Sequence, residues 1–168
     1  MRVERLAVHH DLGSFHCGVK GLDDWLRAHA LDNQRRNLSR TFVLVDDNGQ
    51  VAGYYSLTMG GVRREALPTR YGRGLPRYDI GMVLLARLAI MHGRQGQGLG
   101  RDLLIEAVGR AAAAGQHAAA RFIGVDPIDE NARSFYTAFG FRPVEGDPAD
   151  RMYLRIDEAL AALGGEPA

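Results

Sequence analysis

The stretch IGMVLLARLAIMHGRQGQGLGRDLL, residues 80–104, combines three local patterns that together predict most of the fold. Residues 80–91 form a nearly continuous apolar run, which is typical of a β-strand buried on both faces. Three glycines then fall within residues 96–100. Beyond them, the segment 99–115 carries leucine, alanine and valine at helical spacing. We therefore expect a buried strand, a glycine turn and a helix that form one continuous unit.

Alternating helix and strand patterns flank this unit on both sides. Apolar residues at spacings of three and four predict one amphipathic helix over 22–37. Two β-branched and aromatic runs joined by the turn residues DDNG predict a hairpin over 40–61. Gly115 is the expected end of the helix after the glycine turn, and Asp129 and Gly140 are a candidate N-cap and C′ residue of a later helix. Strands are also expected at 1–8, 120–126 and 150–156, an irregular segment at 61–80, and a short helix with a frayed tail at 157–168.

Length and composition limit the class of protein. A chain of 168 residues is long enough for one domain with its own core, and no Pro- or Ser-rich linker divides it. We therefore expect a single α/β domain over residues 1–168. The first residues lack the apolar core of a signal peptide, and no run approaches the roughly 20 apolar residues of a membrane span, so a cytoplasmic protein is expected. Cys17 is the single cysteine and the six histidines show no metal-ligand spacing, so neither a disulfide nor a metal site is expected.

The charge is unevenly distributed along the chain. The net charge is +1, but residues 1–101 hold 15 Lys and Arg against 9 Asp and Glu, whereas residues 102–168 hold 6 against 11. Arginines concentrate in the segments 34–40 and 62–79. This pattern is compatible with an ordinary solvated surface of an arginine-rich chain, or with a surface that binds phosphates through guanidinium groups. For the second reading, the candidate residues are Arg36, Arg40, Arg73 and Arg77.

The glycine turn has a chemical use as well as a steric one. The amino terminus of a helix exposes unpaired N–H groups and a partial positive charge, so phosphates bind there when the backbone can approach them closely. Glycine provides that approach, but a tight strand-to-helix turn also needs glycine for steric reasons alone. A P-loop would require a Lys-Ser/Thr pair after the last glycine, and a dinucleotide fold would require a repeat of this unit. Neither feature is present in the sequence.

Two motifs resemble those of the GNAT family of N-acetyltransferases. The segment QGQGLG, residues 95–100, matches the family's Q/R-x-x-G-x-G/A motif, and NARSFYTAFGF, residues 131–141, is similar to its N-A-x-x-F-Y-x-x-x-G-F segment. The resemblance implies a single-domain GNAT fold, α/β with a mixed central sheet and a splayed pair of parallel strands between helices. It also implies that acetyl-CoA binds with its pantetheine arm along the strand and its pyrophosphate on the glycine turn. The cofactor-binding residues so implied are Leu88, Ala89, Ile90, Gln95, Gly96, Gln97, Gly98, Leu99, Gly100, Arg101 and Asn131.

The resemblance extends to a narrower group over nearly the whole chain. The segments FHCGVKGLDDWL, VAGYYSLTMGGV and LLARLAI look like those of the acetyltransferase toxins of toxin-antitoxin pairs. Such a toxin acetylates the α-amine of aminoacyl-tRNA and is neutralised by a ribbon-helix-helix antitoxin, and a homodimer is expected. Tyr136 lies where related enzymes place the general acid that protonates the leaving thiolate; without the resemblance it reads as a core aromatic beside Phe135 and Phe139. Asn131 either binds the cofactor or caps its helix, and Cys17 is interpreted as a buried thiol rather than a nucleophile.

The chemistry of the amine agrees with this substrate. An α-amine has a pKa near 7.7–8.0 and esterification of its carboxyl group lowers it further, so it is largely neutral without a strong general base. A lysine amine near 10.4 is almost wholly protonated at neutral pH. Two other functions stay open at this point: acetylation of a small metabolite amine or a protein amino terminus, and a non-catalytic module that binds coenzyme A or an antitoxin.

Overall fold

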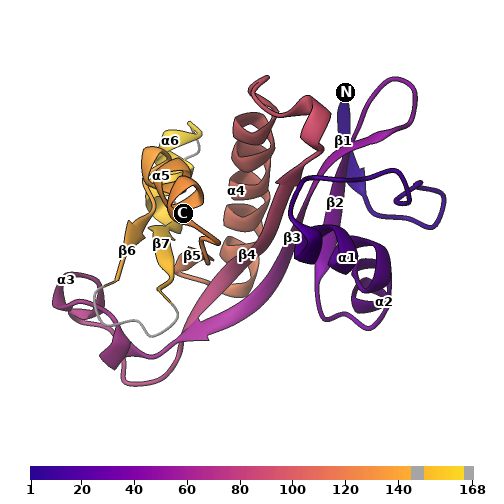
Figure 1. Ribbon diagram of the computed structural model, residues 1–168. Coiled ribbons are helices and arrows are strands. Elements are labelled where there is room, and N and C mark those ends of the chain that lie inside the picture. Colours follow the sequence, from indigo (N-terminus) through magenta and orange to yellow (C-terminus); the bar gives the residue numbers. More distant parts are fainter. Residues whose placement is uncertain (145–149, 165–168) are drawn as a thin grey trace. The chain divides into compact units, whose positions relative to one another are not determined.

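The computed structural model describes residues 1–144 and 150–164. Over these residues, seven strands hydrogen-bond in the order β1-β2-β3-β4-β5-β7-β6. The strands β4 and β5 are parallel, with Met82–Leu85 paired to Phe122–Val125. Because β4 continues to Ile90, its last five residues extend beyond that pairing. The α/β class and the mixed sheet with one parallel pair, which the resemblance implied, are confirmed (Figure 1).

The chain forms two compact units. The first contains Met1–Thr58 and Ala86–Ala107, and the second contains Met59–Leu85 and the chain from Val108 onward. The elements β3, β4 and α4 each run from one unit into the other. The expectation of one domain over residues 1–168 stays a prediction. No helix within the described ranges combines the length and the apolar character that a membrane crossing needs.

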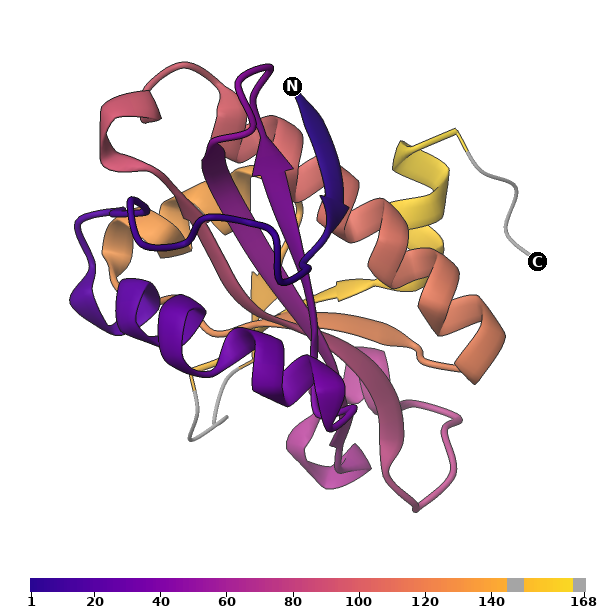
Figure 2. The same cartoon turned by 90° about the vertical axis from the view of Figure 1, so that its right-hand side faces the viewer.

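The first unit is an antiparallel sheet with two helices on one face. Figures 1 and 2 show the two helices against β2 and β3. Between this face and the helices lies a core that includes Leu26, Val43, Tyr54 and Ala89. The elements are β1 (Arg2–Arg5), α1 (Lys20–Ala28), α2 (Ala30–Arg35), β2 (Arg40–Val45), β3 (Val51–Val62), β4 (Ile80–Ile90) and the start of α4 (Leu99–Ala118).

The helix expected over 22–37 is in fact two helices, so that prediction was wrong in its continuity. The break lies at His29, whose φ of −124° leaves the helical region, although its N–H still bonds to the carbonyl of Trp25. Ala30, just after the break, is fully buried in the core, as is Leu26 before it. Trp25 packs against the same core, as its helical spacing indicated.

The hairpin between β2 and β3 follows the prediction. Its DDNG turn is held by Asp46, whose carboxylate accepts hydrogen bonds from the N–H groups of Gln50 at 3.0 Å and Asn48 at 2.9 Å. These bonds, that of Gln50 foremost, lower the pKa of Asp46. Gly49 supplies the left-handed φ of +82° that closes the turn.

The second unit surrounds β5 with the remaining strands and helices. Its core includes Val62, Met82, Phe122 and Tyr153. The two-residue strand β6 was not predicted, and the segment expected to be irregular holds two short helical turns. The elements are a 3-10 turn (Arg64–Ala66), α3 (Thr69–Gly72), the rest of α4, β5 (Phe122–Val125), α5 (Glu130–Ala138), β6 (Arg142–Pro143), β7 (Met152–Arg155) and α6 (Ile156–Ala162). The tail expected after 164 lies outside the described residues.

Gly115 does not end its helix, contrary to the prediction. α4 continues to Ala118 and terminates at Ala119, which has a positive φ of +56°. Gly115 instead makes room for a neighbour, because a Cβ placed on it would lie 2.2 Å from Cδ1 of the buried Ile156. The glycine therefore serves close packing between α4 and the start of α6.

Two glycines of α4 should therefore differ in how much an alanine in their place changes the stability of the protein. Gly109 has only an ordinary contact, 3.6 Å from a would-be Cβ to Leu163. Both Gly115→Ala and Gly109→Ala gain the same intrinsic helix propensity, but only the first overpacks the core. We expect Gly115→Ala to have a free energy of unfolding about 1–3 kcal/mol below that of Gly109→Ala in urea titrations. Equal values for the two variants would contradict the packing role.

Candidate active site

The glycine turn joins β4 to α4 and adopts a backbone that only glycine tolerates well. Gly96 and Gly98 have φ values of +75° and +83°, and a Cβ on either would meet nothing within 4 Å. These glycines are therefore required by conformation and not by lack of space. α4 begins directly afterwards at Leu99, and its first bond within the helix runs from the N–H of Asp102 to the carbonyl of Gly98.

This geometry leaves backbone N–H groups that could donate hydrogen bonds to an anion, and anion binding at the turn stays a prediction. In a helix whose first internal bond is made by Asp102, the N–H groups of Leu99, Gly100 and Arg101 have no intrahelical acceptor. The turn residues before them are exposed, so a ligand can reach these groups. The partial positive charge of the helix terminus favours a phosphate there.

Two side chains fix the turn from within the first unit. Arg94 forms an ion pair with Asp46 of the hairpin, with 2.8 Å between Nη2 and Oδ2. The side-chain amide of Gln95 donates to the carbonyls of Ile90 at 3.0 Å and Cys17 at 2.8 Å. Gln95 was expected to bind the cofactor; its side chain holds the turn against the end of β4, and a cofactor contact of this residue stays a prediction.

The end of β4 provides the main chain that the resemblance assigns to pantetheine. Leu88, Ala89 and Ile90 lie beyond the pairing with β5, and the last two are buried. Sequence reasoning missed Gly53 on β3, where a Cβ would lie 3.0 Å from the carbonyl oxygen of Ala89 and 2.7 Å from Cδ1 of Ile90. Gly53 thus lets this part of β4 approach its neighbour.

Arg87 is a second residue that sequence reasoning missed. Its guanidinium carbon lies 3.9 Å from the ring centroid of Trp25, which in turn is stacked on Tyr54. Burial lowers its pKa, and a guanidinium remains cationic at neutral pH. Among residues 1–144 and 150–164, the structure records no hydrogen bond or ion pair of Arg87. A single charge inside the apolar run 80–91 is the sequence signal that could have found it.

The second unit carries the other family motif on α5. Asp129 is the N-cap, because its carboxylate accepts a bond of 2.8 Å from the N–H of Ala132. Gly140, with φ of +91°, follows the C-cap as predicted. The alternative that Asn131 caps this helix is therefore wrong. Asn131 is exposed in the first turn, and its role in cofactor binding stays a prediction.

Tyr136 lies in an aromatic cluster on the same helix. Its ring centroid is 5.4 Å from that of Phe135 and 5.6 Å from that of Phe141, both in edge-to-face arrangement. Only 8% of the residue is exposed. Burial, assisted by the charge of Asp126, raises the pKa of Tyr136 to about 12. The hydroxyl is therefore protonated throughout the physiological range, as a proton donor requires. For the part of the chain described, no hydrogen bond from this hydroxyl is recorded.

The four candidate phosphate-binding arginines, which the resemblance would assign to tRNA, differ in how far their side chains are engaged within the fold. Arg36 is exposed and forms an ion pair with Asp32, with 3.7 Å between Nη1 and Oδ2. Arg40 is engaged within the fold, because it donates to the carbonyl of Gln34 at 3.0 Å and to the side chain of Asn37. Arg40 therefore closes the end of α2, and charge removal there will also disturb the helix.

Arg73 and Arg77 line a basic hollow in the second unit. The hollow has a volume of about 460 Å³. Arg64, also in its wall, is held by a bond of 3.1 Å from Nε to the carbonyl of Gly72. The other lining residues are Glu65, Leu67, Thr69 and Gly72. That the four candidate arginines form one phosphate-binding wall stays a prediction.

Cys17 is a buried thiol, as the sequence interpretation held. Only 6% of the residue is exposed, and its Sγ lies 3.7 Å from the carbonyl oxygen of Val19. Burial, together with the neighbouring Asp23, raises the pKa of the thiol to about 11. A thiol with that pKa is a poor source of thiolate at neutral pH.

Comparison with known proteins agrees with these features. The model of the acetyltransferase (GNAT) family matches residues 8–141. The chain is 39% identical over 160 residues to a tRNA-acetylating toxin of Mycobacterium tuberculosis, with 95% of each chain covered. Among solved structures it is similar to AtaT complexed with acetyl-methionyl-tRNAfMet, with a TM-score of 0.88, 28% identity, and 97% of this chain and 98% of that chain covered. It is also similar to a tyrosine-to-phenylalanine mutant of AtaT bound to the C-terminus of the antitoxin AtaR and acetyl-CoA, with a TM-score of 0.82, 27% identity and 97% of both chains covered. The family match, in agreement with the glycine turn, establishes that this chain belongs to the GNAT family of acetyltransferases.

Proposed function

We propose that this protein is a toxin that transfers the acetyl group of acetyl-CoA to the α-amine of aminoacyl-tRNA. The observation that carries the proposal is the exposed glycine turn, which presents N–H groups without helical acceptors at the start of α4, after the end of β4 that extends beyond its pairing with β5. The choice of acceptor rests on the near full-length similarity to a tRNA-acetylating toxin. A tRNA acceptor would place the reaction in the cytoplasm.

The main chain of the glycine turn and of the end of β4 would bind acetyl-CoA. We assign the pyrophosphate to the N–H groups of Leu99, Gly100 and Arg101, where the helix terminus supplies positive potential. The amide groups of pantetheine would pair with the main chain of residues 88–90, much as another strand would. The N–H groups of this segment would also stabilise the oxyanion that forms when the amine attacks the thioester carbonyl.

Tyr136 would act as the proton donor in the last step. As the carbon–sulfur bond breaks, negative charge builds on the sulfur, and a neutral phenol can donate a hydrogen bond to it. A phenol with a pKa of about 12 does not readily transfer its proton to the thiolate of a thiol with a pKa of about 8.5. The benefit of Tyr136 therefore lies in its position and its hydrogen bond during charge build-up.

Arg87 would recognise a phosphate of the acceptor. Successive side chains of a strand point to opposite faces, so Arg87 shares the face of Ala89, on the side of α1. A half-buried cation without an anionic partner is costly, and a substrate phosphate would supply that partner. Arg73 and Arg77 in the basic hollow would add contacts to the acceptor stem.

The family also implies two protein partners. We infer a ribbon-helix-helix antitoxin that binds this chain, and a homodimer of the chain itself. The solved complex of AtaT with part of AtaR supports an antitoxin partner. Light scattering and co-purification with the product of a neighbouring gene test these two inferences directly.

The function is tested by offering the enzyme several amines together with labelled acetyl-CoA. We expect label on total aminoacylated tRNA and none on the same tRNA after deacylation. Free polyamines and peptide amino termini serve as competing acceptors. Efficient labelling of these small amines with none on charged tRNA would favour the metabolic alternative, and no thiol release with any acceptor would favour a non-catalytic module.

Gly98→Ala tests the cofactor site. An L-residue at φ of +83° is strained by about 1–2 kcal/mol, which distorts the turn and should weaken acetyl-CoA binding by about 5- to 30-fold in calorimetry. Gly93→Ala is the matched control, because Gly93 lies in the same loop with open space and without a left-handed φ. If both folded variants bind like the wild type, the pyrophosphate does not lie on this turn.

Tyr136→Phe tests the proton donor. The variant keeps the ring packing, so acetyl-CoA affinity and thermal stability should change little, while kcat should fall by about 100-fold or more. The exposed Tyr78, changed to Phe, is the control. Because the pKa of about 12 keeps the phenol protonated, wild-type kcat should rise with pH as the α-amine loses its proton and show no decline below pH ~10. Wild-type turnover in Tyr136→Phe would return this residue to the core-aromatic interpretation.

Arg87→Gln tests acceptor recognition. We expect KM for charged tRNA to rise about 10-fold or more, with acetyl-CoA affinity within about 2-fold of the wild type, because a charge-assisted phosphate contact is lost. The wild-type KM should also rise steeply with added salt, and Arg87→Gln should show a shallower salt dependence. Arg5→Gln removes an exposed arginine of β1 as a control for net charge. An unchanged KM in Arg87→Gln would assign this arginine to packing on Trp25 alone.

A further inference from the structure

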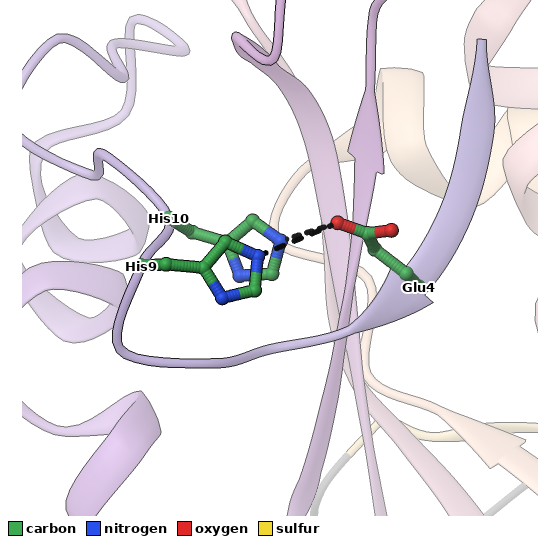
Figure 3. Close-up of side chains that lie close together, drawn as sticks. All are labelled: Glu4, His9 and His10. Atoms are coloured by element: carbon green, nitrogen blue, oxygen red, sulfur yellow. Dashed lines mark hydrogen bonds and ion pairs between the residues drawn. The ribbon is translucent and has the colours of Figure 1, made fainter.

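We propose that Glu4, His9 and His10 form a binding site for a divalent transition metal, with Zn²⁺ as the ion that the donor set fits. One carboxylate oxygen and two imidazole nitrogens lie within 4.8 Å of one another (Figure 3). Histidine nitrogen and carboxylate oxygen are established zinc ligands, and two histidines with one glutamate form a common three-ligand set. This site is independent of the proposed acetyl transfer.

The carboxylate of Glu4 is already aimed at both rings. Its Oε1 lies 2.7 Å from Nε2 of His10 and 3.8 Å from Nε2 of His9. Tetrahedral zinc with ligand bonds of about 2.0–2.1 Å needs ligand atoms about 3.3 Å apart, which the two observed distances bracket. The other oxygen, Oε2, accepts a bond of 2.9 Å from Nε of Arg2, which leaves Oε1 for the histidines.

His10 is buried and held in place by the backbone of Ala7, with its Nε2 toward Glu4. Its side chain is only 2% exposed, and its Nδ1 lies 2.9 Å from the backbone nitrogen and 3.1 Å from the carbonyl oxygen of Ala7. Without metal, Nδ1 can accept from that N–H while Nε2–H donates to Glu4. With metal, the proton would reside on Nδ1 and be donated to the Ala7 carbonyl, the Ala7 N–H would give up its bond to the ring, and Nε2 would be free to bind the ion. Such a backbone partner is the usual support of a ligating histidine.

His9 is free to complete the site. Its side chain is 72% exposed, and its recorded contacts within the described residues are with Glu4 and the ring of His10. A small rotation would bring its Nε2 to the ligand distance. Three protein ligands leave the fourth position of a tetrahedral ion for water.

A bound ion would connect two segments of the first unit. Glu4 lies on β1, where it pairs with Val43, and the histidines follow in the turn that begins at Ala7. The loop beyond them delivers Phe15 and Cys17 to the core. Metal binding should therefore stabilise the attachment of this loop to the sheet.

The test is a titration of tag-free, metal-stripped full-length protein with ZnCl₂ in a calorimeter. We expect one Zn²⁺ per chain and an affinity at least about 10-fold lower in His9→Ala. His117→Ala is the matched control, since His117 is an exposed histidine of α4 and should leave the affinity within about 2-fold of the wild type. Glu4→Gln provides a second variant, and thermal unfolding without metal checks that each variant folds.

Two further readouts distinguish this site from loose association. Co²⁺ should give the visible absorption of a tetrahedral centre in the wild type and in His117→Ala, and lose it in His9→Ala. Zn²⁺ should raise the melting temperature of the wild type but not of His9→Ala, while acetyl transfer by His9→Ala stays at the wild-type rate. Equal affinity in wild type and His9→Ala, or no uptake at about 100 µM free Zn²⁺, would overturn the proposal.

Discussion

The left-handed backbone at Gly96 and Gly98 is the constraint on which the site depends. It turns the chain from β4 into α4 within a few residues, and it leaves the first N–H groups of the helix without acceptors. Two contacts maintain this geometry. Arg94 forms an ion pair with Asp46 of the hairpin, and the side chain of Gln95 donates a hydrogen bond to the carbonyl of Ile90 at the end of β4. The pyrophosphate site that we propose here would therefore need little side-chain chemistry, because the backbone conformation supplies its donors.

The features that follow from local sequence could be predicted, and those that depend on distant neighbours could not. The glycine turn, the hairpin and both caps of α5 are local, since each is decided by residues a few positions apart. The break at His29 was not predicted because apolar residues at spacings of three and four continue through it without interruption. Gly115 was misread because its packing partner, Ile156, is far along the chain.

The same distinction between local and distant determinants applies to the residues of the candidate site. The motif residues on the turn and on α5 were identified from the sequence. The hydrogen bonds by which Gln95 holds the turn, and the close approach of Gly53 to β4, became visible only in the structure. The stack of Arg87 on Trp25 and the meeting of Glu4 with two histidines also join segments whose spacing carries no known motif. For Tyr136, packing in an aromatic cluster and a role as proton donor are compatible, because burial raises the pKa of a phenol that is already protonated at neutral pH.

The most direct measurement is a crystal structure of this protein with coenzyme A. The account predicts the pyrophosphate within hydrogen-bond distance of the N–H groups of Leu99, Gly100 and Arg101, with Gly96 and Gly98 still left-handed. It also predicts pantetheine beside the main chain of residues 88–90. A pyrophosphate bound elsewhere, for example in the basic hollow at Arg73 and Arg77, would contradict the assignment of the glycine turn as the cofactor site.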